Sequence, residues 1–258
     1  MGGKKKKMGT LSKDQRSTPI KSGSKTKNQK LFILHGWTYS TDKWDPFLKI
    51  LKRNDYELEL LKIPGLTEPL DEAWDISDYV QWINAKIGEK KTTLIGHSNG
   101  GRVAMAFALK YPNKIEKLIL IDSAGIRDKK LSTKLKRFIF YRLAKFGKNI
   151  TSSVFLKDLL YKSAGEKDYE LATPIMKQTM NNLISFDLEP HLSEIRIPTL
   201  IIWGEKDKIT PLYFAEIINK QIRNSKLIVV RGAKHSPQFT HPKEVFNCIS
   251  NFILKQFN

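Results

Sequence analysis

The sequence predicts an α/β fold in which a doubly wound, mostly parallel sheet of about six strands is covered by helices on both faces. Short, nearly continuous apolar runs recur from residue 31 onward, and most of them end at Gly, Pro, Asp or Asn. Segments with apolar residues at helical spacing lie between these runs. Runs that do not alternate with polar residues are typical of strands buried on both faces. Strands that alternate with helices are typical of a doubly wound sheet.

The apolar runs and the segments between them place the individual elements. Strands are expected at 31–34, 58–63, 93–95, 118–121, 200–203 and 227–230. Helices are expected around 47–51, 79–87, 103–107, 214–218 and 245–253, where the apolar spacing is helical. The helix after the third strand should end at Tyr111-Pro112, because a residue that precedes proline disfavours the helical conformation.

One interval interrupts this alternation. Residues 126–192 contain no convincing strand, and apolar residues such as Leu131, Leu135 and Phe138 repeat with helical spacing. The sequence therefore predicts a helical lid inserted at the carboxyl edge of the sheet. We expect its apolar face to cover the site and most of its Lys and Arg side chains to face solvent.

Charge is distributed unevenly along the chain. The 258 residues include 45 Lys and Arg against 26 Asp and Glu, a formal net charge of +19. Residues 1–30 hold ten Lys and Arg against Asp14 alone, which is +9 of that excess. Segment 1–28 has almost nothing to bury, so we expect a disordered basic tail that at most contacts acidic surfaces weakly. The domain at 29–258 is much less basic and does not require a nucleic-acid partner.

Composition also limits the class of protein. No apolar run approaches the ~18 residues of a transmembrane segment, and no apolar stretch follows the basic start as in a secretory signal. The single cysteine, Cys248, excludes an intramolecular disulfide, and its place in a predicted helix favours a buried, inert thiol. We therefore expect a cytoplasmic protein.

The strongest functional signal is Gly96-His97-Ser98-Asn99-Gly100, which follows a predicted strand and precedes a predicted helix. A nucleophile at such a tight turn needs glycine two residues before and two residues after it, because larger side chains would collide. The turn raises the Ser98 hydroxyl above the carboxyl edge of the sheet. It also directs the Asn99 amide, at a helix start, toward the same point. Ser98 is therefore the candidate nucleophile.

A serine hydroxyl needs a histidine base and an acid that orients this base. His235, one of five histidines, follows the last predicted strand directly, and Asp207 follows the strand before it. The order Ser98, Asp207, His235 is the order in which successive strands bring such a triad to one edge. Asp122, at the end of the 118–121 strand, is the second choice for the acid.

The other titratable candidates are weaker. Glu205 shares a loop with Asp207 but does not stand where the motif places the acid. His97 belongs to the turn and should pack behind it, while His191 and His241 adjoin prolines.

A developing oxyanion needs a second backbone donor besides the Asn99 amide. Leu34-His35-Gly36-Trp37 follows the first strand, and Gly36 allows the backbone to approach closely. The Trp37 amide is the candidate second donor. In the alternative interpretation, Gly36 forms an ordinary turn and Trp37 only caps the core.

Four segments in this order resemble the α/β-hydrolase fold, in particular its lidded serine hydrolases, which include carboxylesterases and carbon–carbon bond hydrolases. They are His35-Gly36-Trp37, Gly96-His97-Ser98-Asn99-Gly100, Trp203-Gly204-Glu205-Lys206-Asp207 and Gly232-Ala233-Lys234-His235. The resemblance covers roughly residues 30–258. A serine at position 98, rather than an aspartate, argues against the haloalkane dehalogenase and epoxide hydrolase branches. The family commonly begins with a β-hairpin, which residues 1–28 are too polar to form, so about six rather than eight strands are expected.

The resemblance implies a serine hydrolase, without metal or cofactor, that cleaves an ester or related acyl bond of a small molecule through an acyl-enzyme. The first alternative is a carbon–carbon bond hydrolase of a vinylogous diketone acid. Such an enzyme needs a site for the substrate carboxylate, which the basic insertion would supply. A non-enzymatic binding module is the least expected function, because it leaves a complete triad unexplained.

Overall fold

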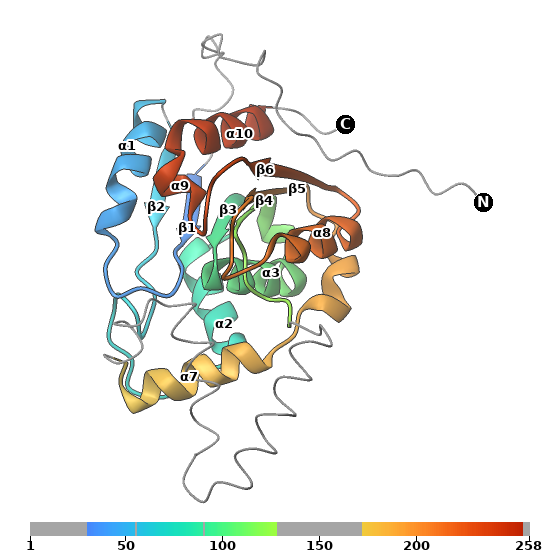
Figure 1. Cartoon of the computed structure of the whole chain (residues 1–258). Helices are drawn as coiled ribbons and strands as arrows, with labels where there is room; N and C mark the ends of the chain where they lie inside the picture. Colours follow the sequence, from blue (N-terminus) through green and yellow to red (C-terminus); the bar gives the residue numbers. More distant parts are fainter. Residues whose placement is uncertain (1–29, 55, 90, 128–171, 255–258) are drawn as a thin grey trace, which may run out of the picture.

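The computed structural model describes residues 30–54, 56–89, 91–127 and 172–254. Within these residues, one six-stranded sheet has the order β2-β1-β3-β4-β5-β6, and every neighbouring pair is parallel (Figure 1). The strands are β1 (Lys30–Leu34), β2 (Glu57–Leu60), β3 (Thr92–His97), β4 (Ile115–Ile121), β5 (Thr199–Gly204) and β6 (Ser225–Val230). The predicted α/β class and the predicted number of strands are confirmed.

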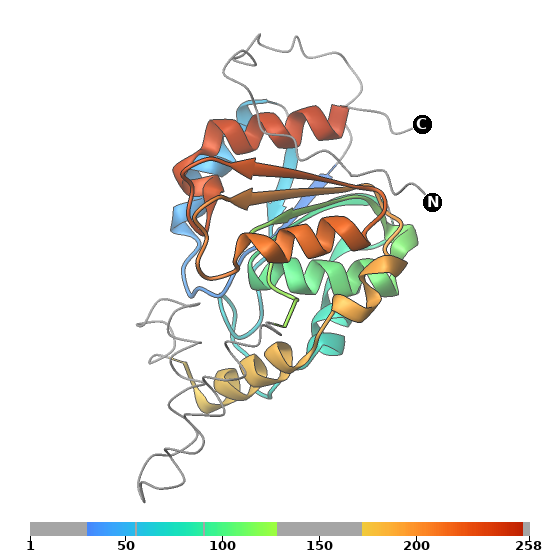
Figure 2. The ribbon, with the colours of Figure 1, turned by 45° about the vertical axis from the view of Figure 1, so that its right-hand side comes forward.

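Helices cover both faces of this sheet (Figures 1 and 2). One face carries α1 (Asp45–Arg53), α9 (Pro237–Thr240) and α10 (Pro242–Leu254), and the other carries α2 (Ile76–Ile87), α3 (Asn99–Lys110) and α8 (Leu212–Gln221). The helix α7 (Pro174–Ser185) and the short 3-10 helices η1 (Asp42–Trp44), η2 (Pro112–Lys114) and η3 (Glu189–Glu194) complete the described elements. The five predicted helices are confirmed, and α3 ends directly before Tyr111-Pro112.

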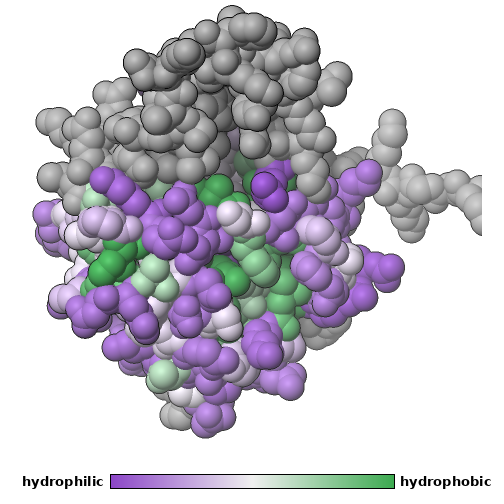
Figure 3. Space-filling view, turned by 90° about the horizontal axis from the view of Figure 1, so that it is seen from below, coloured by the Kyte–Doolittle hydropathy of each residue, from purple (hydrophilic) through white to green (hydrophobic). Residues whose placement is uncertain are grey.

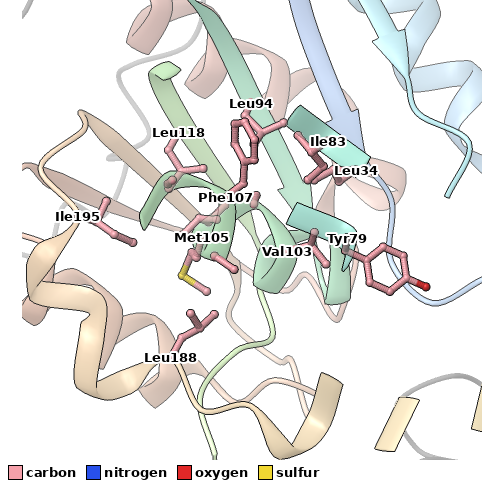
Figure 4. Close-up of a cluster of buried hydrophobic side chains, with 14 of the residues drawn as sticks. Leu34, Tyr79, Ile83, Leu94, Val103, Met105, Phe107, Leu118, Leu188 and Ile195 are labelled. Carbon is pink, nitrogen blue, oxygen red and sulfur yellow. The ribbon is translucent and has the colours of Figure 1, made fainter. Parts of the chain in front are cut away.

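Alternate residues of a central strand enter two different hydrophobic cores. In β4, Leu118 and Leu120 pack in the core formed with α2, α3 and α8, whereas Ile119 and Ile121 pack in the core formed with α1 and α10. All four side chains are fully buried. Figure 4 shows the first core, in which Leu118 lies near side chains of α3. Burial on both faces explains why the apolar runs of the sequence are continuous.

Some predicted boundaries are wrong. The second strand was expected to reach Ile63, but β2 ends at Leu60 because the chain then turns. The Ile63 amide donates to Thr67 Oγ1 (2.8 Å) instead of a neighbouring strand, and Gly65 adopts a φ of 82°. The four-residue helix α9 was not expected, because a segment that short shows no helical period.

The insertion is described only at its two ends, which are joined beside the sheet. The Leu188 amide donates to the Gly125 carbonyl (2.9 Å), and the Arg127 amide donates to Asp187 Oδ1 (3.3 Å). Residues 128–171, with most of the predicted lid, and the predicted tail at 1–28 lie outside the described residues. The last 3-10 turn, η3, extends two residues beyond the predicted end of the insertion at 192.

Helix α7 anchors the returning end of the insertion to the domain. The Trp74 amide donates to Thr179 Oγ1 (3.1 Å), and Met180 packs against the half-buried side chain of Trp37.

Figure 3 views the molecule from below Figure 1, and the coloured part of this face shows apolar side chains as separate patches between hydrophilic ones. None of the described helices is long and apolar enough to span a bilayer.

Candidate active site

Ser98 occupies a strained turn between β3 and α3. Its φ of 53° and ψ of −120° lie outside the regions that a serine ordinarily adopts. Neighbouring backbone holds this conformation: the Ser98 amide donates to the Ile121 carbonyl (3.1 Å), and the Ser98 carbonyl accepts from the amides of Gly101 (3.0 Å) and Ala124 (2.9 Å). The end of β4 and the loop after it therefore fix the position of Ser98.

Close backbone packing explains the two glycines of the motif. A Cβ atom at Gly96 would lie 2.6 Å from the Gly101 Cα atom, and one at Gly100 would lie 2.3 Å from the Leu34 carbonyl oxygen. Neither neighbour is a flexible side chain that could move away. The predicted requirement for glycine on both sides of Ser98 is thus met by the geometry of the turn.

His235 and Asp207 meet at the same edge of the sheet. His235 Nδ1 lies 2.8 Å from Asp207 Oδ2, and the Asp207 side chain is fully buried. The carboxylate is fixed by three further donors: the Ile209 amide (2.8 Å) and the Thr210 amide (3.1 Å) to Oδ1, and Thr210 Oγ1 (2.7 Å) to Oδ2. Because Nδ1 faces the carboxylate, Nε2 is the ring nitrogen left for proton transfer.

Asp122 lies beside this pair but joins backbone segments instead. Its Oδ1 accepts from the Gly204 amide (2.8 Å), and its Oδ2 accepts from the Ser236 amide (2.7 Å). These amides belong to the loops that carry Asp207 and His235. Burial, reinforced by the negative charge of Asp207, raises the pKa of Asp122 to about 7, although both backbone hydrogen bonds favour the charged form.

The same three residues have the spacing of a possible metal site. Ligand atoms of Asp122, Asp207 and His235 lie within 4.8 Å of one another. However, the two carboxylates already accept hydrogen bonds from backbone amides, and His235 Nδ1 faces Asp207. This arrangement fits the orientation of an imidazole better than the coordination of an ion.

His97 packs behind the turn, as the sequence predicts. It is buried, its ring centroid lies 5.1 Å from that of His235, and its Nε2 is 3.1 Å from Ser236 Oγ. Burial lowers the pKa of His97 well below its usual value, and the positive charge of His235 acts in the same direction. His97 is therefore neutral at physiological pH.

The remaining weak candidates have other partners. His191 pairs with Glu194 (2.9 Å), and His241 Nδ1 contacts Thr240 Oγ1 (2.9 Å). Glu205 Oε2 accepts from the Gly232 amide (2.8 Å). The Cys248 thiol is buried, and burial raises its pKa to about 12, which agrees with the inert thiol expected from sequence.

The segments that carry the two predicted oxyanion donors lie next to Ser98. Asn99 is the first residue of α3, where amide groups lack partners within the helix. Trp37 follows Gly36, and a Cβ atom at Gly36 would lie 3.0 Å from the Ser98 Cβ atom. The segment after β1 is therefore close to the candidate nucleophile.

Sequence reasoning missed Arg102. This arginine follows Ser98 by four residues and is buried among the apolar residues of α3. The available signal was a lone charged residue in a run of glycine, alanine and apolar residues, from Gly100 to Leu109. Such a residue on a buried helix usually has a specific partner or function.

Comparisons with known proteins identify the family of the chain. Residues 30–242 match the family model of the α/β hydrolase fold. The pimeloyl-[acyl-carrier protein] methyl ester esterase of Wigglesworthia glossinidia brevipalpis is 28% identical over 253 residues, which cover 88% of this chain and 94% of that protein. A bacterial membrane phospholipase A has a similar structure (TM-score 0.65, 23% identity, 90% of this chain and 80% of that one). So does a serine hydrolase of carbazole degradation (TM-score 0.64, 19% identity, 88% and 91%). Since the family match spans most of the sequence, the chain belongs to the α/β-hydrolase family.

Proposed function

We propose that the protein is a serine esterase that cleaves an ester bond of a small molecule through an acyl-enzyme. Ser98 is the nucleophile, His235 the base and Asp207 the acid that orients the base. The observation that carries this proposal is the 2.8 Å pairing of a buried carboxylate with His235, at the edge where the strained turn presents Ser98. Asp122 is a poorer choice for the acid, because its two oxygens accept backbone amides.

The reaction follows from the order of these groups. His235 Nε2 removes the hydroxyl proton as Ser98 Oγ attacks the ester carbonyl, while Nδ1–H stays bonded to Asp207. The amides of Asn99 and Trp37 donate to the oxyanion as it forms. The imidazolium then gives its proton to the departing alcohol. Water, activated by His235 in the same way, hydrolyses the acyl-enzyme and restores Ser98.

The surroundings of His235 favour this cycle. Asp207 supplies a fixed negative charge opposite the imidazolium that forms in each step. His97, the nearest ring, stays neutral because it is buried, so it does not repel that charge. The positive end of the α3 dipole lies at Asn99, where the oxyanion charge would develop.

Esters are the first substrate class to test. The relative from Wigglesworthia glossinidia brevipalpis is named as a methyl ester esterase and is aligned along most of its length. This similarity supports ester cleavage, with a methyl ester of an acyl compound as one candidate. The solved structure of the carbazole-degradation hydrolase shares the fold, and a dienoate substrate therefore belongs in the same screen.

A hydrolysis screen with matched variants tests the proposal. We expect wild-type protein to cleave p-nitrophenyl esters of graded chain length, and Ser98→Ala to lose at least about 10³-fold in turnover. Ser225→Ala, at the opposite, amino end of β6, is the control and should retain wild-type turnover. Hydrolysis by Ser98→Ala at the wild-type rate would contradict the proposal. Faster cleavage of a dienoate than of any ester would favour the carbon–carbon bond hydrolase.

A further inference from the structure

The guanidinium of Arg102 is buried, and two of its three nitrogens lack a hydrogen-bond partner among the described residues. The residue is 7% exposed, and its Nε and Nη1 atoms are buried without a hydrogen-bond acceptor in the part of the chain that the structure describes. Its guanidinium makes no ion pair with a carboxylate of those residues. Burial lowers the pKa of Arg102 only to about 10, so the group is charged at neutral pH. A buried, unpaired charge is costly, which points to a partner that is supplied from outside the described domain.

The position of Arg102 places it next to the candidate active site. Its Cα atom lies 3.7 Å from where a Cβ atom at Gly125 would stand, and Leu188 Cδ1 lies 3.0 Å from that same point. Arg102 is therefore close to the loop that follows β4, whose Ala124 amide donates to the Ser98 carbonyl. Helical side chains tilt toward the helix N-terminus, which in α3 is the end next to Ser98.

The described carboxylate that acts on the charge of Arg102 does not form an ion pair with it. Asp187 acts on Arg102 electrostatically but lies beyond ion-pair distance. Asp187 Oδ1 accepts from the amides of Arg127 (3.3 Å) and Glu189 (3.2 Å), which hold it at the junction of the insertion. Arg102 thus keeps hydrogen-bonding capacity for another anion.

We propose that Arg102 is a specificity-determining residue that binds a carboxylate of the substrate. The preferred substrates are then esters with a free carboxylate a few bonds from the scissile carbonyl, such as half-esters of short dicarboxylic acids. This inference rests on the proposed esterase function of Ser98, because the second group of the substrate is placed relative to that nucleophile.

The chemistry of the site fits a carboxylate. Guanidinium binds carboxylate through strong, charge-assisted hydrogen bonds, often two in parallel. Removal from water strengthens this attraction, and the N-terminal end of α3 adds partial positive charge. Ser98 directly precedes α3 and Arg102 follows it by four residues, ~6 Å along the axis at about 1.5 Å per residue, which favours substrates with a short spacer between the two groups.

Paired substrates test this inference. We expect wild-type protein to prefer the monomethyl ester of glutaric or adipic acid over the corresponding dimethyl ester. Arg102→Met should lower kcat/KM for the monomethyl ester by roughly 10- to 100-fold, the loss expected for one charge-assisted contact. The same variant should hydrolyse the dimethyl ester within about twofold of the wild-type rate. Arg127→Gln, which removes an exposed positive charge nearby, is the control and should leave the preference unchanged.

A binding measurement separates this inference from the proposed function. In the Ser98→Ala background, which removes the proposed nucleophile, glutarate or adipate should raise the melting temperature, and Arg102→Met should abolish this increase. An equal loss of turnover on both esters, with no ligand-induced shift in either background, would assign Arg102 a structural role and overturn the inference. Dicarboxylate binding without any ester hydrolysis would instead refute the proposed esterase while retaining the anion site.

Discussion

The interior of the sheet and its carboxyl edge are built in opposite ways. In the interior, strand residues such as Ile95 and Leu118 are fully buried and pack in one of two hydrophobic cores. At the edge, the described non-glycine residues with positive φ are Ser98, Asp122 and Ser236, which follow β3, β4 and β6. The strand interiors, which have ordinary backbone angles, are thus apolar, whereas the residues with strained backbone angles at the edge are polar.

This difference shows how the fold maintains an unfavourable site. A positive φ in a non-glycine residue costs on the order of 1–3 kcal/mol and persists only where surrounding structure enforces it. Here neighbouring strands and loops enforce it: the Asp122 amide donates to the Ile202 carbonyl (3.0 Å), and the Ser236 amide donates to Asp122 Oδ2 (2.7 Å). Activity should therefore depend on the edge, and stability on the interior.

At the edge, a change of the candidate acid should lower turnover by several powers of ten. Asp207→Asn should lower turnover by about 10³- to 10⁴-fold, because an amide stabilises the wrong tautomer of His235 and does not stabilise the imidazolium. Steady-state kinetics on an ester that the wild type cleaves would measure this loss, with circular dichroism as the control for folding. If Asp122→Asn lost more turnover than Asp207→Asn, the acid would be Asp122.

In the interior, a large cost in stability without a loss of turnover is expected. Leu118→Ala removes a fully buried side chain from β4 and should lower the free energy of unfolding by roughly 2–5 kcal/mol. Turnover per folded molecule should stay near the wild-type value at low temperature. Urea unfolding and kinetics on the same preparation test this separation, and a parallel loss of turnover would show that the two regions are coupled.

At Ser98 we expect a substitution that raises stability and removes turnover. Glycine accepts the φ of 53° without steric strain, so Ser98→Gly should raise the free energy of unfolding by about 1 kcal/mol or more while abolishing turnover. Chemical denaturation of Ser98→Gly and Ser98→Ala side by side would measure the strain. A glycine variant that is less stable than the alanine variant would show that the turn stores no strain.

Among the edge variants, the smallest change in turnover is expected for Asp122→Asn, together with a change in how stability depends on pH. Asp122→Asn should cost about tenfold in turnover or less, because one backbone hydrogen bond to its side chain is lost. The pKa of Asp122 is raised from 3.8 to about 7 in the folded protein, so the folded state holds a proton that the unfolded chain releases between these values. This contribution to stability is full below about pH 4 and is lost as the pH rises through about 7.

Melting temperatures from pH 4 to pH 8 test the sign of this effect. The difference between wild type and Asp122→Asn should shift toward the variant as the pH rises, since the variant has no carboxyl to deprotonate. A constant difference across this range would show that Asp122 has the same pKa in both states.

Much of this architecture could be predicted from sequence, because it depends on local patterns. The continuous apolar runs identified the strands, and the spacing of glycines around Ser98 identified the turn. The positions of Asp207 and His235 after consecutive strands placed them at one edge. Each of these signals needs only the period of the strand or the steric limits of a tight turn.

The features that sequence could not predict depend on contacts between distant segments. Nothing near Asp122 in the chain indicates that its carboxylate accepts the amides of Gly204 and Ser236, more than eighty residues away. The burial of Arg102 requires the loop at Gly125 and the chain at Leu188 to close over α3. Such tertiary contacts have no local period.

Active-site labelling tests the central claim most directly. If Ser98 is activated by His235 and Asp207, a fluorophosphonate probe should attach to Ser98 in the native protein, as located by mass spectrometry of its peptides. Labelling should fall steeply in His235→Ala and vanish in Ser98→Ala. Labelling of another residue, or labelling of the wild type that persists unchanged in His235→Ala, would contradict the assignment of the triad.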